Sequence, residues 1–304
     1  LDDNIFLMGE EVAYYNGAYK VSQGMLEEFG ESRVIDTPIS ENGFAGLGIG
    51  AAMVGMRPII EFMTWNFAFV AFDQIINTAA KTYAMSGGQY NLPIVFRGAN
   101  GAAENLGAQH STSVDSLFAH FPGLKVVTYA DSADAYGLLK SAIRDDNPVI
   151  FYEPKGVYQN TSSIPDDDYV IPLGVADVKR EGEDATIIAM GAMVPTALSA
   201  AEQLSKDSIS VEVVDPCTLR PLDTDTLIAS VSKTGRCVIV HEANTFGGFG
   251  GEIAATLADL AFDKLKAPIK RIGGLEAPVP VSPSLEGAAV PGQQEIIETV
   301  RALI

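Results

Sequence analysis

The strongest constraint on the fold is an alternation of short β-rich runs with longer segments rich in small residues. In the first half of the chain the β-rich runs are RVIDT, RPIIEFM, PIVFRG, KVVTYA and PVIFYEP, and helical patterns cover 42–55, 66–85 and 132–144. In the second half the runs are ATIIAMG, ISVEVVD, RCVIVHEA and APIKRIG, with helical patterns at 193–206, 223–233, 251–265 and 292–303. Strands that alternate with helices favour βαβ units and mostly parallel sheets flanked by helices. The sequence therefore predicts an α/β fold.

Length and a change in composition together predict two domains. The chain has 304 residues, and about 150 residues per domain is the usual prior. The segment 155–175 is rich in Pro, Asp and Ser and has no hydrophobic periodicity, which is typical of a surface connection. We therefore expect a first domain at 1–160, a linker at 161–176 and a second domain at 177–304.

Charge and cysteine content exclude several kinds of partner. The formal net charge is −19, with 20 basic and 39 acidic side chains, whereas binding to nucleic acid or to an anionic membrane needs clustered Lys and Arg. No apolar stretch approaches the roughly 20 residues of a membrane-spanning helix. The two cysteines, Cys217 and Cys237, have neither zinc-site spacing nor a disulfide framework, so we expect buried thiols in a reducing compartment.

A single carboxylate, Glu41, stands at the start of the small-residue segment ENGFAGLGIGAAMVG. It can be a first-turn acid that the helix dipole stabilises. Alternatively, the neighbouring Ile39, Phe44 and Leu47 desolvate the carboxylate, which then shares a proton with a ligand nitrogen. The glycines of the segment also leave two interpretations open, because they permit either close helix–sheet packing or contact with another backbone or ligand.

Two further segments contain candidate functional side chains. The stretch EFMTWNFAFVAFDQI holds more aromatic rings than one strand–helix connection needs, so one ring can face a cleft while the others form core. His110 lies in the segment NGAAENLGAQHSTS, between two predicted strands, where loops often carry acid–base groups. We expect His120 and His241 to be structural.

An ordered set of motifs along the chain resembles the β subunits of pyruvate dehydrogenase E1, which are thiamine-diphosphate-dependent 2-oxo acid dehydrogenases. The motifs are GEEVAYYNGAYKVSQG, DTPISENGFAG, EFMTWNF, DQIINTAAKTYAMSGGQ, PIVFRGANGA, AQHS, PGLKVV, SAIRDDNPVI and TLRPLDTDTL. The resemblance covers nearly the whole chain. It implies a transketolase-like pyrimidine-binding domain followed by a transketolase C-terminal domain.

The resemblance also implies roles for individual residues. Glu41 is expected to hydrogen-bond N1′ of the aminopyrimidine of thiamine diphosphate, while Phe67 stacks on that ring and Ile39 lines its pocket. His110 corresponds to a histidine at the active-site entrance that aids acetylation of a lipoyl group. A structural potassium ion is expected at carbonyl groups together with one asparagine, namely at Ile94, Ala142, Ile143, Asp145 and Asn147.

The chain lacks a G-D-G segment, which in the resembled family begins the site for Mg²⁺ and the diphosphate. The resemblance therefore implies that an E1 α subunit holds Mg²⁺, that the two chains form an α₂β₂ heterotetramer, and that the acetyl group of pyruvate passes to E2 dihydrolipoyl acetyltransferase. It places the enzyme in the bacterial cytoplasm or the mitochondrial matrix. Two alternatives remain, a β subunit of a branched-chain 2-oxo acid or acetoin dehydrogenase, and a non-catalytic scaffold subunit that binds E2.

Overall fold

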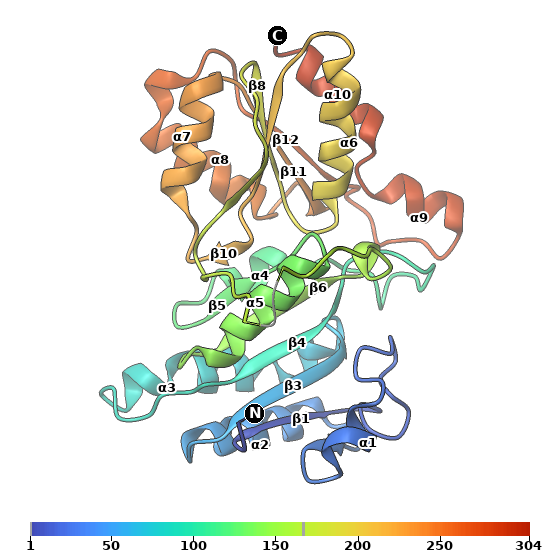
Figure 1. Cartoon of the computed structure of the whole chain (residues 1–304), viewed down its shortest axis with the longest axis vertical. Coiled ribbons are helices and arrows are strands. Elements are labelled where there is room, and N and C mark those ends of the chain that lie inside the picture. Colours follow the sequence, from blue (N-terminus) through green and yellow to red (C-terminus); the bar gives the residue numbers. More distant parts are fainter. Residues whose placement is uncertain (1, 166–167) are drawn as a thin grey trace.

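The chain forms two β-sheets, each flanked by helices, in a computed structural model that describes residues 2–165 and 168–304. The first sheet has seven strands in the order β10-β5-β6-β4-β3-β1-β2, and the second has five in the order β12-β11-β8-β9-β7. Figure 1 shows the two sheets stacked along the long axis, with the N-terminal half below. All neighbouring strands are parallel except the pairs β10–β5 and β7–β9. The predicted α/β class with mostly parallel sheets is confirmed.

The first sheet is built almost entirely from the first half of the chain. Its strands are β1 (Ile5–Gly9), β2 (Val34–Asp36), β3 (Arg57–Thr64), β4 (Val95–Asn100), β5 (Lys125–Val127), β6 (Val149–Pro154) and β10 (Thr218–Arg220). Every residue of β4 and β6 is buried, as is typical of central strands covered on both faces. β10 comes from the second half of the chain and pairs with β5, so it ties the two halves together.

The helical elements around this sheet are short apart from two. They are α1 (Met25–Phe29), α2 (Glu41–Met53), η1 (Phe67–Ala71), η2 (Gln74–Ala79), α3 (Ala80–Met85), α4 (Asp115–Ala119), α5 (Ser132–Arg144) and η3 (Lys155–Val157). The single helix expected over 66–85 was wrong, because this stretch is a 3₁₀ turn, a π-helix and a short α-helix in succession. Its buried residues Ala71, Ile75 and Ala79 are four apart. Side chains four positions apart lie close to one face of a helix, so these residues face the core together.

The second sheet is covered by helices on both faces. Its strands are β7 (Asp177–Arg180), β8 (Ala185–Ala189), β9 (Val211–Asp215), β11 (Cys237–Asn244) and β12 (Lys270–Gly274). Its helices are α6 (Met193–Ser205), α7 (Thr224–Thr234), α8 (Gly250–Leu260), η4 (Phe262–Lys264), α9 (Pro283–Ala289) and α10 (Gln293–Arg301). α6 packs against α10 on one face and α7 against α8 on the other (Figure 1).

The connection between the halves is mostly exposed in its described residues. From 158 to 176 the described residues form no helix or strand. Two residues of the expected linker, Asp166 and Asp167, lie outside the described part of the chain. Among the residues described, no helix has the length and apolarity that crossing a bilayer requires.

Candidate functional site

The predicted cofactor residues gather at one edge of the first sheet. Glu41, Phe67 and His110 follow β2, β3 and β4, and these strands lie side by side with β1 in the parallel order β4-β3-β1-β2. From β1 the chain continues to β2 on one side of β1, and it then crosses to β3 and β4 on the other side of β1. Ligands of open α/β sheets bind where the strand order reverses in this way, outside the carboxyl ends of the strands. The topology therefore places the switch point, where a ligand is expected, between the carboxyl ends of β1 and β3.

Glu41 is the first residue of α2 and is buried, with 6% of its surface exposed. α2 lies close to the sheet because Gly48 faces Ile60, and a Cβ at position 48 would lie 2.6 Å from Ile60 Cδ1. The expectation that three apolar neighbours shield Glu41 was wrong for two of them, since Ile39 is 86% and Leu47 is 67% exposed. Ile39 precedes the helix, and Leu47 lies on the side of α2 away from the sheet.

A second acid, Glu10, lies beside Glu41 and was missed by the sequence reasoning. It directly follows β1, and its Oε1 atom is buried with no hydrogen-bond partner in the described part of the chain. Burial, together with the neighbouring charge of Glu41, raises the pKa of Glu10 to about 7. An unpaired buried carboxylate indicates a missing donor or a bound proton. The one signal for Glu10 is its position at the end of β1, the strand that pairs with both β2 and β3.

Phe67 and His110 come together although 43 positions separate them. Their ring centroids are 5.1 Å apart in an edge-to-face arrangement, and both side chains are partly exposed. Asn66 links the same two segments, because its Oδ1 atom accepts a hydrogen bond from the Thr112 backbone N–H at 3.2 Å. Of the other rings of this stretch, Trp65 is fully buried in the core and Phe72 is partly buried, but Phe69 is 46% exposed, so the expectation that the remaining rings form core was wrong for Phe69. The structure thus leaves one ring of this stretch facing the histidine.

The potassium residues of the resemblance lie at the opposite, amino-terminal edge of the sheet, around the turn between α5 and β6. Arg57 Nη1 donates to the carbonyls of Ile143 and Asp145, at 3.0 and 3.1 Å. The carbonyls of Ile94 and Ala142 accept from backbone N–H groups. The Asp145 carboxylate pairs with Lys125 and accepts from Asn147. Arg57 and Lys125 therefore supply positive charge at this turn, and potassium binding there stays a prediction. In the described residues, no three His, Cys, Asp or Glu side chains cluster as a metal site requires.

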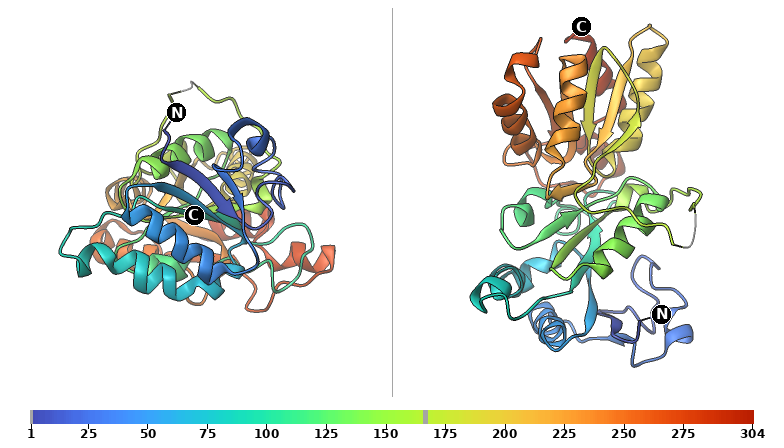
Figure 2. Two further views of the ribbon diagram at one scale, coloured as in Figure 1. Left: turned by 90° about the horizontal axis from the view of Figure 1, so that it is seen from below. Right: turned by 60° about the vertical axis from the view of Figure 1, so that its left-hand side comes forward.

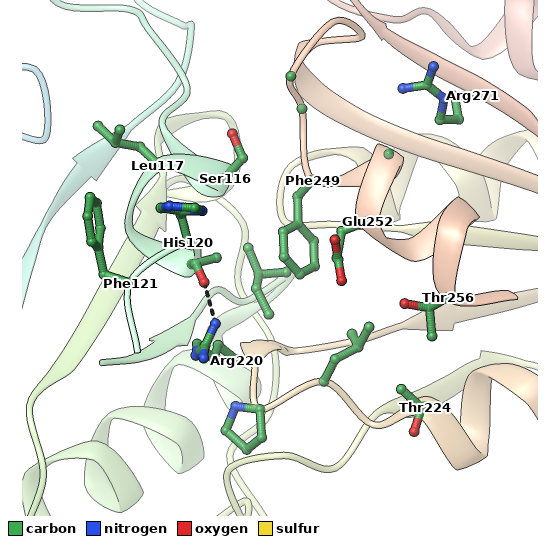
Figure 3. A pocket seen from close by; sticks show the side chains of 17 residues that line it. Ser116, Leu117, His120, Phe121, Arg220, Thr224, Phe249, Glu252, Thr256 and Arg271 are labelled. Atoms are coloured by element: carbon green, nitrogen blue, oxygen red, sulfur yellow. Dashed lines mark hydrogen bonds between the residues drawn. The ribbon is translucent and has the colours of Figure 1, made fainter. Parts of the chain in front are cut away.

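A separate cavity of about 910 Å³ lies between the two halves and contains none of the predicted site residues. Figure 3 shows His120 and Phe121 on one side and Phe249 and Glu252 on the other. Arg220 lies between them and donates through Nη1 to the Ala119 carbonyl at 2.8 Å. The expectation of a structural role for His120 is not supported by burial, because its side chain is exposed. His241, by contrast, is fully buried.

Comparisons with known proteins agree on both halves of the chain. The family model for the transketolase pyrimidine-binding domain matches residues 1–161, and the model for the transketolase C-terminal domain matches residues 174–296. A solved structure described as a split-gene transketolase in an inactive β4 tetramer superposes with a TM-score of 0.81, covering 99% of this chain and 92% of that one. Its 22% identity supports the fold alone.

Two relatives have much higher identity. Pyruvate dehydrogenase E1 component subunit beta of Rickettsia felis is 53% identical over 300 residues, covering 99% of this chain and 92% of the relative. The mitochondrial pyruvate dehydrogenase E1 component subunit beta of Drosophila melanogaster is 49% identical over 302 residues, covering 98% and 83%.

The fold, the switch point in the first sheet and the two matched domains define a transketolase-like protein with a pyrimidine-binding domain and a C-terminal domain. Within that class, the chain belongs to the family of pyruvate dehydrogenase E1 β subunits.

Proposed function

We propose that this chain, paired with an E1 α subunit, holds the aminopyrimidine half of thiamine diphosphate at the switch point between β1 and β3. The enzyme decarboxylates pyruvate oxidatively and transfers the acetyl group to the lipoyl group of E2, in a bacterial cytoplasm or a mitochondrial matrix. The observation that carries this proposal is the pair Glu10 and Glu41, two adjacent buried acids at the switch point of the sheet.

The residues at this edge fit an aminopyrimidine. Within the part of the chain that is described, the Glu41 carboxylate has no hydrogen-bond partner and Glu10 Oε1 is buried without one. A ring nitrogen that carries or shares a proton would satisfy an acid in this position. Phe67 is partly exposed beside them on η1, which contacts α2, and an aromatic face of this kind suits a flat heterocycle.

Thiamine diphosphate, when bound, supplies a nucleophilic thiazolium carbon and the electron sink that decarboxylation of a 2-oxo acid requires. Glu41 holds the proton at N1′ of the pyrimidine, and its buried position keeps water from competing for that proton. Glu10 strengthens this arrangement because its raised pKa keeps a second exchangeable proton near Glu41 at neutral pH. His110, at the rim and in contact with Phe67, is placed to exchange protons with the incoming lipoyl group.

The α partner follows from what this chain does not contain. No G-D-G segment occurs in the sequence, so the partner supplies the groups for Mg²⁺ and the diphosphate. The exposed side of α2 suits that partner, because Leu47 and Val54 are 67% and 81% exposed and a Cβ at Gly50 would meet nothing within 4 Å. Small residues on such a face let a second backbone approach closely.

Reconstitution tests the proposal. The purified chain is mixed with an α subunit that carries the G-D-G segment, thiamine diphosphate, Mg²⁺ and pyruvate, and CO₂ release and lipoyl acetylation are measured separately. We expect both reactions in the mixture and neither with one chain alone. Activity on branched-chain 2-oxo acids or acetoin in place of pyruvate would reassign the substrate. Assembly with a competent partner but no turnover would instead indicate a scaffold.

A further inference from the structure

The segment 101–113, which contains His110, is held by the second half of the chain. From this arrangement we infer that Glu242 is a positioning residue for His110, acting from the C-terminal domain through the backbone at Ala102. The inference rests on the proposed role of His110. Glu242 itself makes no contact with Phe67 or with the acid pair in the described structure, so its effect on the reaction must pass through this segment.

Glu242 lies on β11 of the second sheet, and its carboxylate Oε1 accepts a hydrogen bond from the backbone N–H of Ala102. The neighbouring Gly101 adopts a φ of +83°, and a Cβ there would lie 2.3 Å from Glu242 Oε1. The backbone conformation at position 101 favours glycine, and a side chain there would displace the Glu242 carboxylate.

A second acid of the C-terminal half also forms a hydrogen bond with this segment, further along the chain. Glu286 on α9 accepts from the Asn105 backbone N–H through Oε1 at 3.1 Å. Both ribbon views place the stretch after β4 beside α9 (Figure 1 and Figure 2). At and just before this second anchor, Asn105 and Glu104 have φ values of +57° and +69°. Non-glycine residues keep such conformations only where their surroundings hold them.

The third anchor reaches His110 directly. Lys155 Nζ donates to the His110 carbonyl at 2.7 Å, and Lys155 is only 4% exposed. The carboxylates of Glu242, Glu286 and Glu104 surround this ammonium group and favour its charge, whereas burial lowers the pKa of Lys155. Burial raises the pKa of Glu242 to about 8, and the Lys155 charge opposes that rise. Glu242 therefore holds the start of the segment by the hydrogen bond at Ala102, while Lys155, close to the same acid, holds the end of the segment at His110.

The test compares two substitutions of one side chain in the reconstituted α–β enzyme. Glu242→Ala removes the acceptor of the Ala102 N–H, whereas Glu242→Gln keeps an acceptor oxygen in the same place. Glu276→Ala is the matched control. Glu242 and Glu276 both line a cavity of about 580 Å³. Glu276 is exposed and accepts a hydrogen bond from the Phe246 backbone N–H, so its contact stays within the second half of the chain.

Two measurements are made on each variant. Amide hydrogen exchange over 101–113, followed by mass spectrometry, reports whether the segment is held. The ratio of lipoyl acetylation to pyruvate decarboxylation reports whether His110 is in place. In Glu242→Ala we expect exchange in the segment about tenfold faster, the scale of one lost hydrogen bond. We also expect a selective loss of acetylation that is not additive with His110→Ala. Glu242→Gln and Glu276→Ala should stay within about twofold of the parent chain.

Unchanged exchange over 101–113 in Glu242→Ala would overturn the inference. Faster exchange with an unchanged ratio of the two reactions would overturn the positioning role. Equal losses in Glu242→Gln and Glu242→Ala would show that something other than the acceptor oxygen matters, which also overturns it. Failure of the proposed function is recognised separately, because the parent enzyme would then not decarboxylate pyruvate while the exchange result would still decide whether Glu242 holds the segment.

Discussion

Replacing Glu10 by Gln should stabilise the folded chain above neutral pH. The pKa of Glu10 is raised from 4.5 to about 7 in the folded chain, so the folded state holds this proton more tightly than the unfolded state does. The stability linked to that proton is fully present below the ordinary value of 4.5 and is lost as the pH rises through about 7. Gln carries no titrating proton, so the free energy of unfolding of Glu10→Gln does not fall with pH for this reason.

The size of the effect follows from the same shift. At about 1.4 kcal/mol per pH unit, the difference between the two pKa values sets an upper limit of about 3 kcal/mol. Solvent screening at the open edge of the sheet reduces this, and we expect a gain of about 1–2 kcal/mol in the free energy of unfolding.

Urea unfolding of the purified chain at about pH 5.5 and about pH 8.5 measures the gain. Glu11→Gln is the control, because Glu11 is the exposed neighbour in the sequence. The parent chain should lose stability relative to Glu10→Gln between the two conditions, whereas Glu11→Gln should follow the parent. Identical pH dependence in the parent and in Glu10→Gln would refute the reasoning.

Three further outcomes are expected. Glu41→Gln should abolish turnover in the reconstituted enzyme while size-exclusion chromatography still shows the assembled complex; near-normal turnover would contradict its role. His110→Ala should reduce lipoyl acetylation more than decarboxylation, and equal losses would indicate a general structural effect. Gly48→Ala should lower the free energy of unfolding by about 1–3 kcal/mol, because the new Cβ would lie 2.6 Å from Ile60. Gly50→Ala, which meets open space, should be neutral or raise the stability of the isolated chain by up to about 1 kcal/mol, and equal destabilisation by both substitutions would contradict the packing argument.

The candidate site was only partly predictable from the sequence. Glu41 could be singled out because an acid at the start of an apolar, glycine-rich helix is unusual, and Phe67 because the stretch around it has a surplus of aromatic rings. Glu10 could not, since GEE at the end of a strand resembles any polar turn. Its neighbour Glu41 comes 31 positions later, and only the pairing of β1 with β2 brings the two acids together.

The contacts of the segment 101–113, which contains His110, could not be predicted from the sequence either. The sequence indicates a mobile connection there, because Gly, Ala and Asn dominate it. In the folded chain it is anchored by Glu242 and Glu286, from strands and helices more than a hundred positions away. No local pattern encodes contacts of that separation.

The sequence by itself determined the α/β class and the approximate places of most of its strands and longer helices, because these depend on hydrophobic periodicity and on signals within about a dozen residues. The absence of a G-D-G segment, together with the family resemblance, also led to the expectation of an α partner, which stays a prediction. Only the tertiary structure decided which acids lie together at the switch point, that β10 joins the first sheet, and that the second half holds the His110 segment. Those features arise from strand order and from burial, and both exist only once distant parts of the chain have packed together.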